Sequence, residues 1–219
     1  MIPDMFAPAT EKIRLYDYLP SGNCYKVRLL LSQLGLPFER VHLNVMKGEG
    51  RTPAYRAKNP NERVPLIEWP DGRRLSESDA ILWHLAETTP LLPDDRWQRA
   101  QILQWMFFEQ NNHETSIAVV RFWHMAGLID RKRHELADKM ERGYHALGVM
   151  HKRLSEHAFL VGEEYTIADI ALYAYTHVAD EGGFDLSRFP GIGAWMQRVQ
   201  SQPGHIRITD EVGQLVVWP

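Results

Sequence analysis

The chain as far as Val45 places a strand-like segment on either side of an apolar helical pattern, and this arrangement constrains the fold more than any other feature. Ile13–Tyr18 is an aliphatic and aromatic run that a Pro-Ser-Gly-Asn turn closes. Apolar residues then recur over Val27–Leu34 at the spacing of a buried helix face, and Phe38–Val45 alternates like a second strand. A helix that links two strands predicts a β-α-β unit with parallel strands.

The next segment continues as mixed α/β structure. Thr52-Pro53 is a suitable N-cap and first-turn proline for a short helix. Pro65–Trp69 and Arg73–Leu75 flank a Pro-Asp-Gly turn, which predicts a β-hairpin. Ser76–Asp79 then opens a further helix with an apolar face. The predicted order is β-α-β, a short helix, and β-β-α.

The chain changes character at a proline-punctuated connection, Thr88–Asp95. Beyond it, nearly every segment as far as Gln200 has helical periodicity, and no strand-like alternation persists. Four helices are expected, two long and two shorter: Trp97–Met125, Asp130–His157, Thr166–Asp180 and Arg188–Gln200. We therefore predict an α/β domain at residues 12–88, an all-helical domain at residues 96–205 and a C-terminal tail at residues 206–219.

Composition argues against several classes of function. The formal net charge is only −3, which argues against electrostatic capture of nucleic acid or of an anionic membrane. One cysteine, Cys24, leaves no intrachain disulfide, so a reducing compartment is the default. The first dozen residues hold no apolar run of the kind found in signal peptides or membrane spans. We expect a cytoplasmic protein with neither a nucleic-acid nor a membrane partner.

Four short motifs follow one another along the chain: Leu19–Val27, Asn59–Ile67, the Glu77-Ser78 pair with Ala80-Ile81, and the capping box Thr166–Asp169. In this order they resemble the cytosolic glutathione S-transferases, in the bacterial, serine-type, theta- or nu-like style. The resemblance runs from Ile13 to about Gln202. It implies a thioredoxin-like N-terminal domain, a helical C-terminal glutathione-transferase domain for substrate binding and dimerisation, and a homodimer.

The resemblance implies that two residues at the start of the first helix activate glutathione. Ser21 would hold the sulfur as a thiolate, because the N–H groups of a helix N-terminus and a donated hydroxyl proton both stabilise negative charge. Asn23 would direct a second donor at the same sulfur. Either side chain could instead simply cap the helix. Cys24 is the competing nucleophile, and a buried structural thiol is the favoured interpretation.

The second and third motifs supply the remaining expected contacts to glutathione. A cis bond between Val64 and Pro65 would expose the backbone of Val64 to a peptide ligand, whereas the alternative is a proline that merely starts an edge strand. Glu77 and Ser78 suit the zwitterionic γ-glutamyl end, unless they are ordinary capping residues. Two residues are candidates for the glycine carboxylate, because a guanidinium can bind a carboxylate at two points: Arg63 and, less strongly, Arg51.

The predicted function is therefore a detoxification transferase, in which a glutathione thiolate attacks a small hydrophobic electrophile. Glutathione is the expected cosubstrate, and no metal is expected because the ten histidines include no pair at helical spacing. Two alternatives remain: a glutathione-dependent disulfide or peroxide reductase, and a non-catalytic assembly or regulatory module. Trp218 in the tail would either cover the pocket as a lid or pack on the surface.

Overall fold

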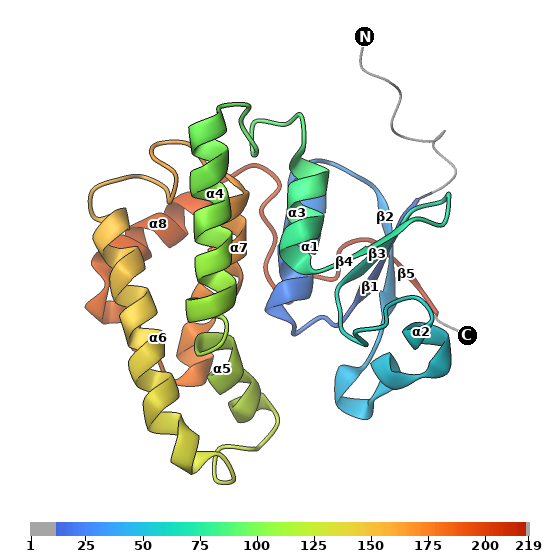
Figure 1. The fold of residues 1–219 in the computed structure, drawn as a ribbon, viewed down its shortest axis with the longest axis horizontal. Helices are drawn as coiled ribbons and strands as arrows, with labels where there is room; N and C mark the ends of the chain where they lie inside the picture. Colours follow the sequence, from blue (N-terminus) through green and yellow to red (C-terminus); the bar gives the residue numbers. More distant parts are fainter. Residues whose placement is uncertain (1–11, 218–219) are drawn as a thin grey trace. The chain divides into compact units, whose positions relative to one another are not determined.

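The structure is a computed structural model that describes residues 12–217 and divides into two compact units (Figure 1). The first unit holds the chain as far as Leu85 together with the segment from Ile206 onward. The second unit is Ala86–His205. Trp218 lies outside the described residues, so the two roles considered for it stay open.

The first unit is built on a five-stranded sheet in the order β4-β3-β1-β2-β5. As the sequence predicts, β1 and β2 are parallel and are linked by helix α1, while β3 and β4 form an antiparallel hairpin. Its main elements are β1 (Ile13–Asp17), α1 (Gly22–Gln33), β2 (Phe38–His42), α2 (Pro53–Arg56), β3 (Leu66–Glu68), β4 (Arg74–Ser76), α3 (Ser78–Ala86) and β5 (Gln214–Val216). Two 3-10 turns, Val45–Lys47 and Glu49–Arg51, connect β2 to α2.

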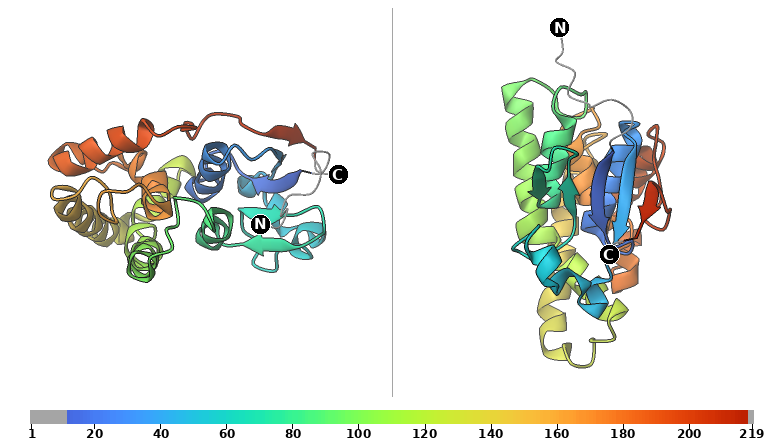
Figure 2. Two further views of the ribbon diagram at one scale, coloured as in Figure 1. Left: turned by 90° about the horizontal axis from the view of Figure 1, so that it is seen from above. Right: turned by 90° about the vertical axis from the view of Figure 1, so that its right-hand side faces the viewer.

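Successive residues of β1 face opposite sides of this sheet and belong to different apolar clusters. Leu15 packs in a cluster with Val27 of α1 and Ile81 of α3. Tyr16, the next residue, packs with Tyr55 of α2 on the other side. The strand period of two therefore places α1 and α3 on one face of the sheet and α2 on the other (Figure 2).

The C-terminal segment adds a strand that the sequence analysis did not predict. β5 pairs in parallel with β2, with Glu39 opposite Gln214 and Val41 opposite Val216. Over its described part, the tail expected at residues 206–219 thus extends the sheet of the first unit.

The second unit is helical, as predicted, but the prediction of one long helix over Trp97–Met125 is wrong. Helix α4 ends at Phe108, a π turn follows over Glu109–His113, and a separate helix starts at Ile117. The reason is competition for backbone groups, since the Asn111 amide donates to the Phe107 carbonyl at 2.9 Å. The main helices are α4 (Arg96–Phe108), α5 (Ile117–Met125), α6 (Arg133–Leu154), α7 (Ile167–Thr176) and α8 (Pro190–Gln200).

The capping box predicted at Thr166–Asp169 is present at the start of α7. The fully buried Asp169 carboxylate accepts hydrogen bonds from the Thr166 N–H at 2.9 Å, the Leu160 N–H at 3.0 Å and the Trp195 indole N–H at 2.9 Å. Burial raises the pKa of this carboxyl to about 6, although these donors act in the opposite direction. The Asp169 side chain thereby joins the start of α7 both to α8 and to the loop that precedes α7.

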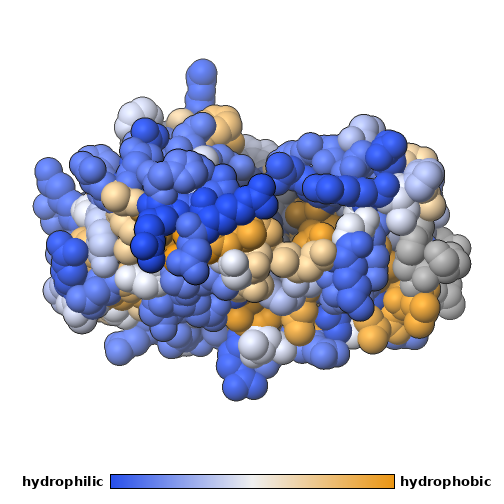
Figure 3. Space-filling view, turned by 90° about the horizontal axis from the view of Figure 1, so that it is seen from below, coloured by the Kyte–Doolittle hydropathy of each residue, from blue (hydrophilic) through white to orange (hydrophobic). Residues whose placement is uncertain are grey.

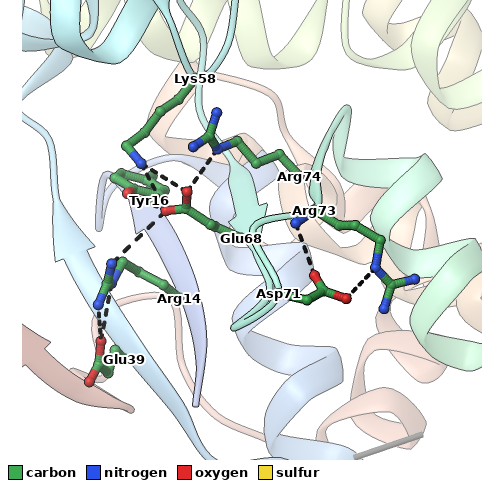
Figure 4. Close-up of polar contacts among 8 residues, drawn as sticks. All are labelled: Arg14, Tyr16, Glu39, Lys58, Glu68, Asp71, Arg73 and Arg74. Atoms are coloured by element: carbon green, nitrogen blue, oxygen red, sulfur yellow. Dashed lines mark hydrogen bonds and ion pairs between the residues drawn. The ribbon is translucent and has the colours of Figure 1, made fainter. Parts of the chain in front are cut away.

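A buried carboxylate organises one face of the first unit's sheet (Figure 4). Glu68 of β3 accepts from the Tyr16 hydroxyl at 2.7 Å, from Lys58 at 2.8 Å and from Arg74 at 2.7 Å. Burial acts to raise the pKa of Glu68, but the hydrogen bonds from Lys58, Tyr16 and Arg74 outweigh it and lower that pKa to about 2. The ionised carboxylate therefore fastens Lys58, which follows α2, to the hairpin.

We expect Glu68→Gln to lower the free energy of unfolding by about 2 kcal/mol at neutral pH. Because the folded-state pKa of about 2 lies below the ordinary 4.5, the ionised group stabilises the fold above its unfolded pKa. That contribution is lost as the pH falls through the folded-state value. Urea unfolding at several pH values checks this, since the gap between wild type and variant should shrink from about pH 5 toward pH 2. A gap that did not change with pH would contradict it.

Candidate functional site

The register of the sheet brings three chain segments to one edge of the first unit. Tyr16 of β1 pairs with Leu66 of β3, and Leu66 pairs with Ser76 of β4. Each of these residues lies at or next to the strand end that adjoins one of the motifs expected to bind glutathione. The turn before α1, the proline loop before β3 and the start of α3 therefore meet at this edge.

Ser21 is the N-cap of α1. Its backbone is extended, with φ −73° and ψ 124°, and its hydroxyl oxygen accepts from the Cys24 N–H at 3.3 Å. The cap considered in the sequence analysis is thus observed. This contact uses an acceptor lone pair of the hydroxyl and not its proton, so capping is compatible with donation to a ligand sulfur.

A side-chain hydrogen bond joins the N-termini of α1 and α3. The Ser78 hydroxyl donates to Asn23 Oδ1 at 3.2 Å, and the ammonium group of Lys26 donates to Ser78 Oγ at 3.3 Å and to Asp79 at 3.1 Å. Lys26 is fully buried although it is charged. Lys26 lies within the motif Leu19–Val27 but is not among the predicted site residues. The sign of a buried lysine in the sequence is its position directly before the apolar helical pattern Val27–Leu34.

Glu77 has a left-handed backbone, with φ 69°, immediately before α3. A residue other than glycine pays about 1–3 kcal/mol for such a conformation, and these outliers cluster at functional sites. Its exposed carboxylate accepts from the Asn61 amide at 3.3 Å. Asn61 is not among the predicted site residues, because nothing in the local sequence pattern pairs it with Glu77.

The bond between Val64 and Pro65 is cis, as predicted. Two hydrogen bonds fix the loop before this bond: the Arg63 carbonyl accepts from the Tyr55 hydroxyl and from the Asn59 amide, each at 2.7 Å. Val64 is half-buried, and Pro65 is buried.

The two candidate arginines for the glycine carboxylate lie on neighbouring segments. Gly50 packs so closely on the Glu62 carbonyl that a Cβ atom there would lie 2.9 Å from the oxygen. Arg51 follows Gly50, Arg63 follows Glu62, and both arginine side chains are exposed. The close contact between the two backbones brings these positive charges to the same part of the first unit.

Cys24 is fully buried, and the Tyr18 N–H donates to its sulfur at 3.4 Å. Burial raises the pKa of the thiol, and the nearby Asp17 carboxylate raises it further. A reactive cysteine needs a lowered pKa and access to solvent. This environment fits the buried structural thiol favoured in the sequence analysis.

Within residues 12–217, no group of three or more histidine, cysteine or acidic residues is arranged to hold a metal ion. In the same described part of the chain, no helix is both long and apolar enough to cross a membrane.

Two family models match the chain: the glutathione S-transferase N-terminal domain over residues 15–93 and the glutathione S-transferase C-terminal domain over residues 99–203. The chain belongs to the glutathione S-transferase family. The predicted fold, a thioredoxin-like sheet domain with a helical C-terminal domain, is confirmed.

Individual proteins are similar to this chain over most of their own length. A crystal structure of a glutathione S-transferase from Pseudomonas fluorescens is 54% identical, with a TM-score of 0.89 over 90% of this chain and 99% of that one. The disulfide-bond oxidoreductase YfcG of Escherichia coli is 31% identical over 87% of this chain and 91% of its own. A structure of Ure2p in complex with glutathione is 27% identical, with a TM-score of 0.81 over 90% of this chain and 98% of that one.

Proposed function

We propose that the protein is a glutathione S-transferase that activates the thiol of glutathione for attack on a small hydrophobic electrophile. The observation that carries the proposal is the Ser78–Asn23 hydrogen bond, which joins two helix N-termini at the sheet edge where the cis-proline loop also ends. Helix N-termini favour anions, and glutathione brings a thiolate and two carboxylates. The glutathione complex of Ure2p supports the choice of ligand.

In this proposal, Ser21 and Asn23 donate hydrogen bonds to the sulfur, and the dipole of α1 stabilises its negative charge. An ordinary thiol, with a pKa near 8.5, is mostly protonated at neutral pH, so lowering its pKa by about two units raises the thiolate fraction roughly 25-fold. The other proposed contacts to glutathione are Val64 and Pro65 for the cysteinyl backbone, Glu77 and Ser78 for the γ-glutamyl end, and Arg63 and Arg51 for the glycine carboxylate.

The second candidate is a glutathione-dependent disulfide reductase, which the similarity to YfcG favours. Product analysis separates the two activities, because a transferase forms one thioether per glutathione consumed, whereas reduction of a disulfide converts two glutathione molecules to glutathione disulfide and releases two thiols. We expect mass spectrometry of the products formed from an aromatic halide and from a symmetric organic disulfide, over a range of concentrations, to give the higher kcat/KM for the thioether. A higher kcat/KM for the disulfide would favour the reductase. Binding without either product would favour a regulatory module such as the transcriptional regulator URE2 of Saccharomyces cerevisiae, which is 28% identical.

A homodimer, a cytoplasmic location and a role in detoxification belong to the same proposal. On one face of the molecule, hydrophobic residues are exposed among hydrophilic ones (Figure 3). In the second unit, Leu103 and Phe107 lie one turn apart on α4, and Phe107 is 62% exposed. Exposed apolar residues that share a helix face are typical of an interface between subunits. We propose that α4 contributes to the contact with a second copy of the chain.

Phe107→Asp is therefore expected to weaken the dimer by roughly tenfold or more, because a charge would be buried among apolar groups. Sedimentation equilibrium of the wild type and the variant measures this. Val149→Asp is the matched control, since Val149 is an exposed apolar residue on another helix, α6. A monomeric wild type, or equal dissociation of both variants, would contradict the assignment of α4.

A further inference from the structure

A single buried guanidinium joins the turn before Ser21 to the C-terminal segment. Arg28 of α1 is fully buried, and its Nη1 donates to the Asp17 carboxylate at the end of β1. Its Nη2 donates to the Leu19 carbonyl at 2.9 Å and to the Ile208 carbonyl at 2.9 Å. Leu19 lies in the turn between β1 and α1, two residues before Ser21.

The segment Ile206–Val216, here called the strap, is fastened to the first unit at further points. The Tyr25 hydroxyl donates to the Ile206 carbonyl at 2.6 Å, and Arg40 Nη2 contacts Glu211 at 3.0 Å. Gly213, with φ +82°, packs on the Phe38 ring of β2 so closely that a Cβ atom would lie 2.6 Å from it. β5 then completes the strap by pairing with β2. The strap is thus a specifically built part of the first unit.

The charges beneath the strap form one buried network. Asp17 is fully buried and contacts both Arg28 and Arg40, the latter at 3.4 Å. A buried charge is strongly destabilising when one of its partners is removed, so each guanidinium depends on the acceptors that it has. For Arg28, one of those acceptors comes from the turn before α1 and another from the strap. The position of the turn therefore depends on contacts that the strap completes.

We propose that the strap is part of the thiol-activating apparatus and that Arg28 is its positioning residue. The inference rests on the proposed function. A hydroxyl and the N–H groups of a helix start stabilise a thiolate only when they are held within about 0.5 Å of the productive geometry. Arg28 fixes the Leu19 carbonyl, and the Ser21 N–H donates to the Tyr18 carbonyl at 2.8 Å within the same turn. Loosening the Leu19 contact moves Ser21 away from the sulfur, while Val64, Glu77 and Ser78, on other segments, still hold the rest of glutathione.

Arg28→Lys tests this, because an ammonium group keeps the charge but does not reproduce the planar fork that reaches Asp17 and two carbonyls together. We expect the pKa of the bound glutathione thiol to rise by about one unit, and kcat/KM at pH values below that pKa to fall roughly tenfold, with little change in glutathione affinity. A second full-length variant, Gly213→Ala, places a Cβ atom 2.6 Å from the Phe38 ring and so displaces the strap, and it should raise the same pKa. The readouts are ultraviolet titration of the thiolate, the pH profile of conjugation, and calorimetric binding of reduced glutathione.

Glu68→Gln is the matched control. Glu68 is a buried charge of the same unit, but it accepts hydrogen bonds from Tyr16, Lys58 and Arg74 rather than from the strap or the turn before α1. It should lower stability and leave the thiol pKa as in the wild type. An unchanged thiol pKa in Arg28→Lys, with glutathione still bound, would overturn the positioning role alone. Equal pKa shifts in Arg28→Lys and Glu68→Gln would overturn it as well. Absence of glutathione binding by the wild type would instead overturn the proposed function and this inference with it.

Discussion

Asp169→Ala is expected to lower the free energy of unfolding by about 4 kcal/mol. The substitution leaves the Leu160 N–H, the Thr166 N–H and the Trp195 indole N–H without their carboxylate acceptor. Each buried donor left without an acceptor costs about 1–3 kcal/mol, part of which local rearrangement recovers. Equilibrium unfolding in urea measures the difference.

Asp138→Ala is a suitable control for that experiment. Asp138 pairs with Arg142 one helical turn away on an exposed face of α6, and such pairs contribute only about 0.3–0.5 kcal/mol. If Asp169→Ala destabilised the protein no more than this control, the capping box would not join α7 to α8 as the structure indicates.

The second large effect concerns chemistry. Replacing Ser21 and Asn23 together by alanine is expected to raise the pKa of the bound glutathione thiol by about two units and to lower kcat/KM at neutral pH roughly 25-fold. The loss should shrink as the pH rises, because hydroxide then removes the proton that the two donors would otherwise help to release. A pH profile of conjugation from neutral to alkaline pH checks both the size and the sign.

Cys24→Ala serves as the control for the double variant. The thiol is fully buried and its pKa is raised, so its removal should leave kcat/KM close to that of the wild type. A large loss in Cys24→Ala, together with a small loss in the double variant, would assign the chemistry to the protein's own thiol.

Most of the fold was predictable because its signals are local. The apolar run of β1, the alternation of β2, the helical period of α1 and the Pro-Asp-Gly turn of the hairpin all lie within short stretches of sequence. β5 was missed because it is three residues long and finds its partner, β2, far away in the sequence. The break after Phe108 was missed because apolar residues resume at Ile117 with helical spacing, which hides the intervening π turn.

The candidate site divides in the same way. The motifs around Ser21, Val64 and Glu77 are visible because each is a contiguous string at a turn. Lys26 beneath Ser78 and the contact of Arg28 with Ile208 join segments that are distant along the chain, so spacing could not reveal them. Such contacts follow from the register of the sheet and the path of the strap, which only the folded structure supplies.

Calorimetric titration with reduced glutathione, carried out on the wild type and on Ser78→Ala, tests whether glutathione binds where the N-termini of α1 and α3 are joined. Ser78 joins the two helix N-termini through Asn23 and is proposed to hold the γ-glutamyl end, so both functions are lost in this variant. We expect saturable binding of one glutathione per chain to the wild type, with a Kd in the micromolar to millimolar range, and a roughly tenfold higher Kd for Ser78→Ala. No heat of binding to the folded wild type at several times that concentration, or equal affinity in the two proteins, would contradict it.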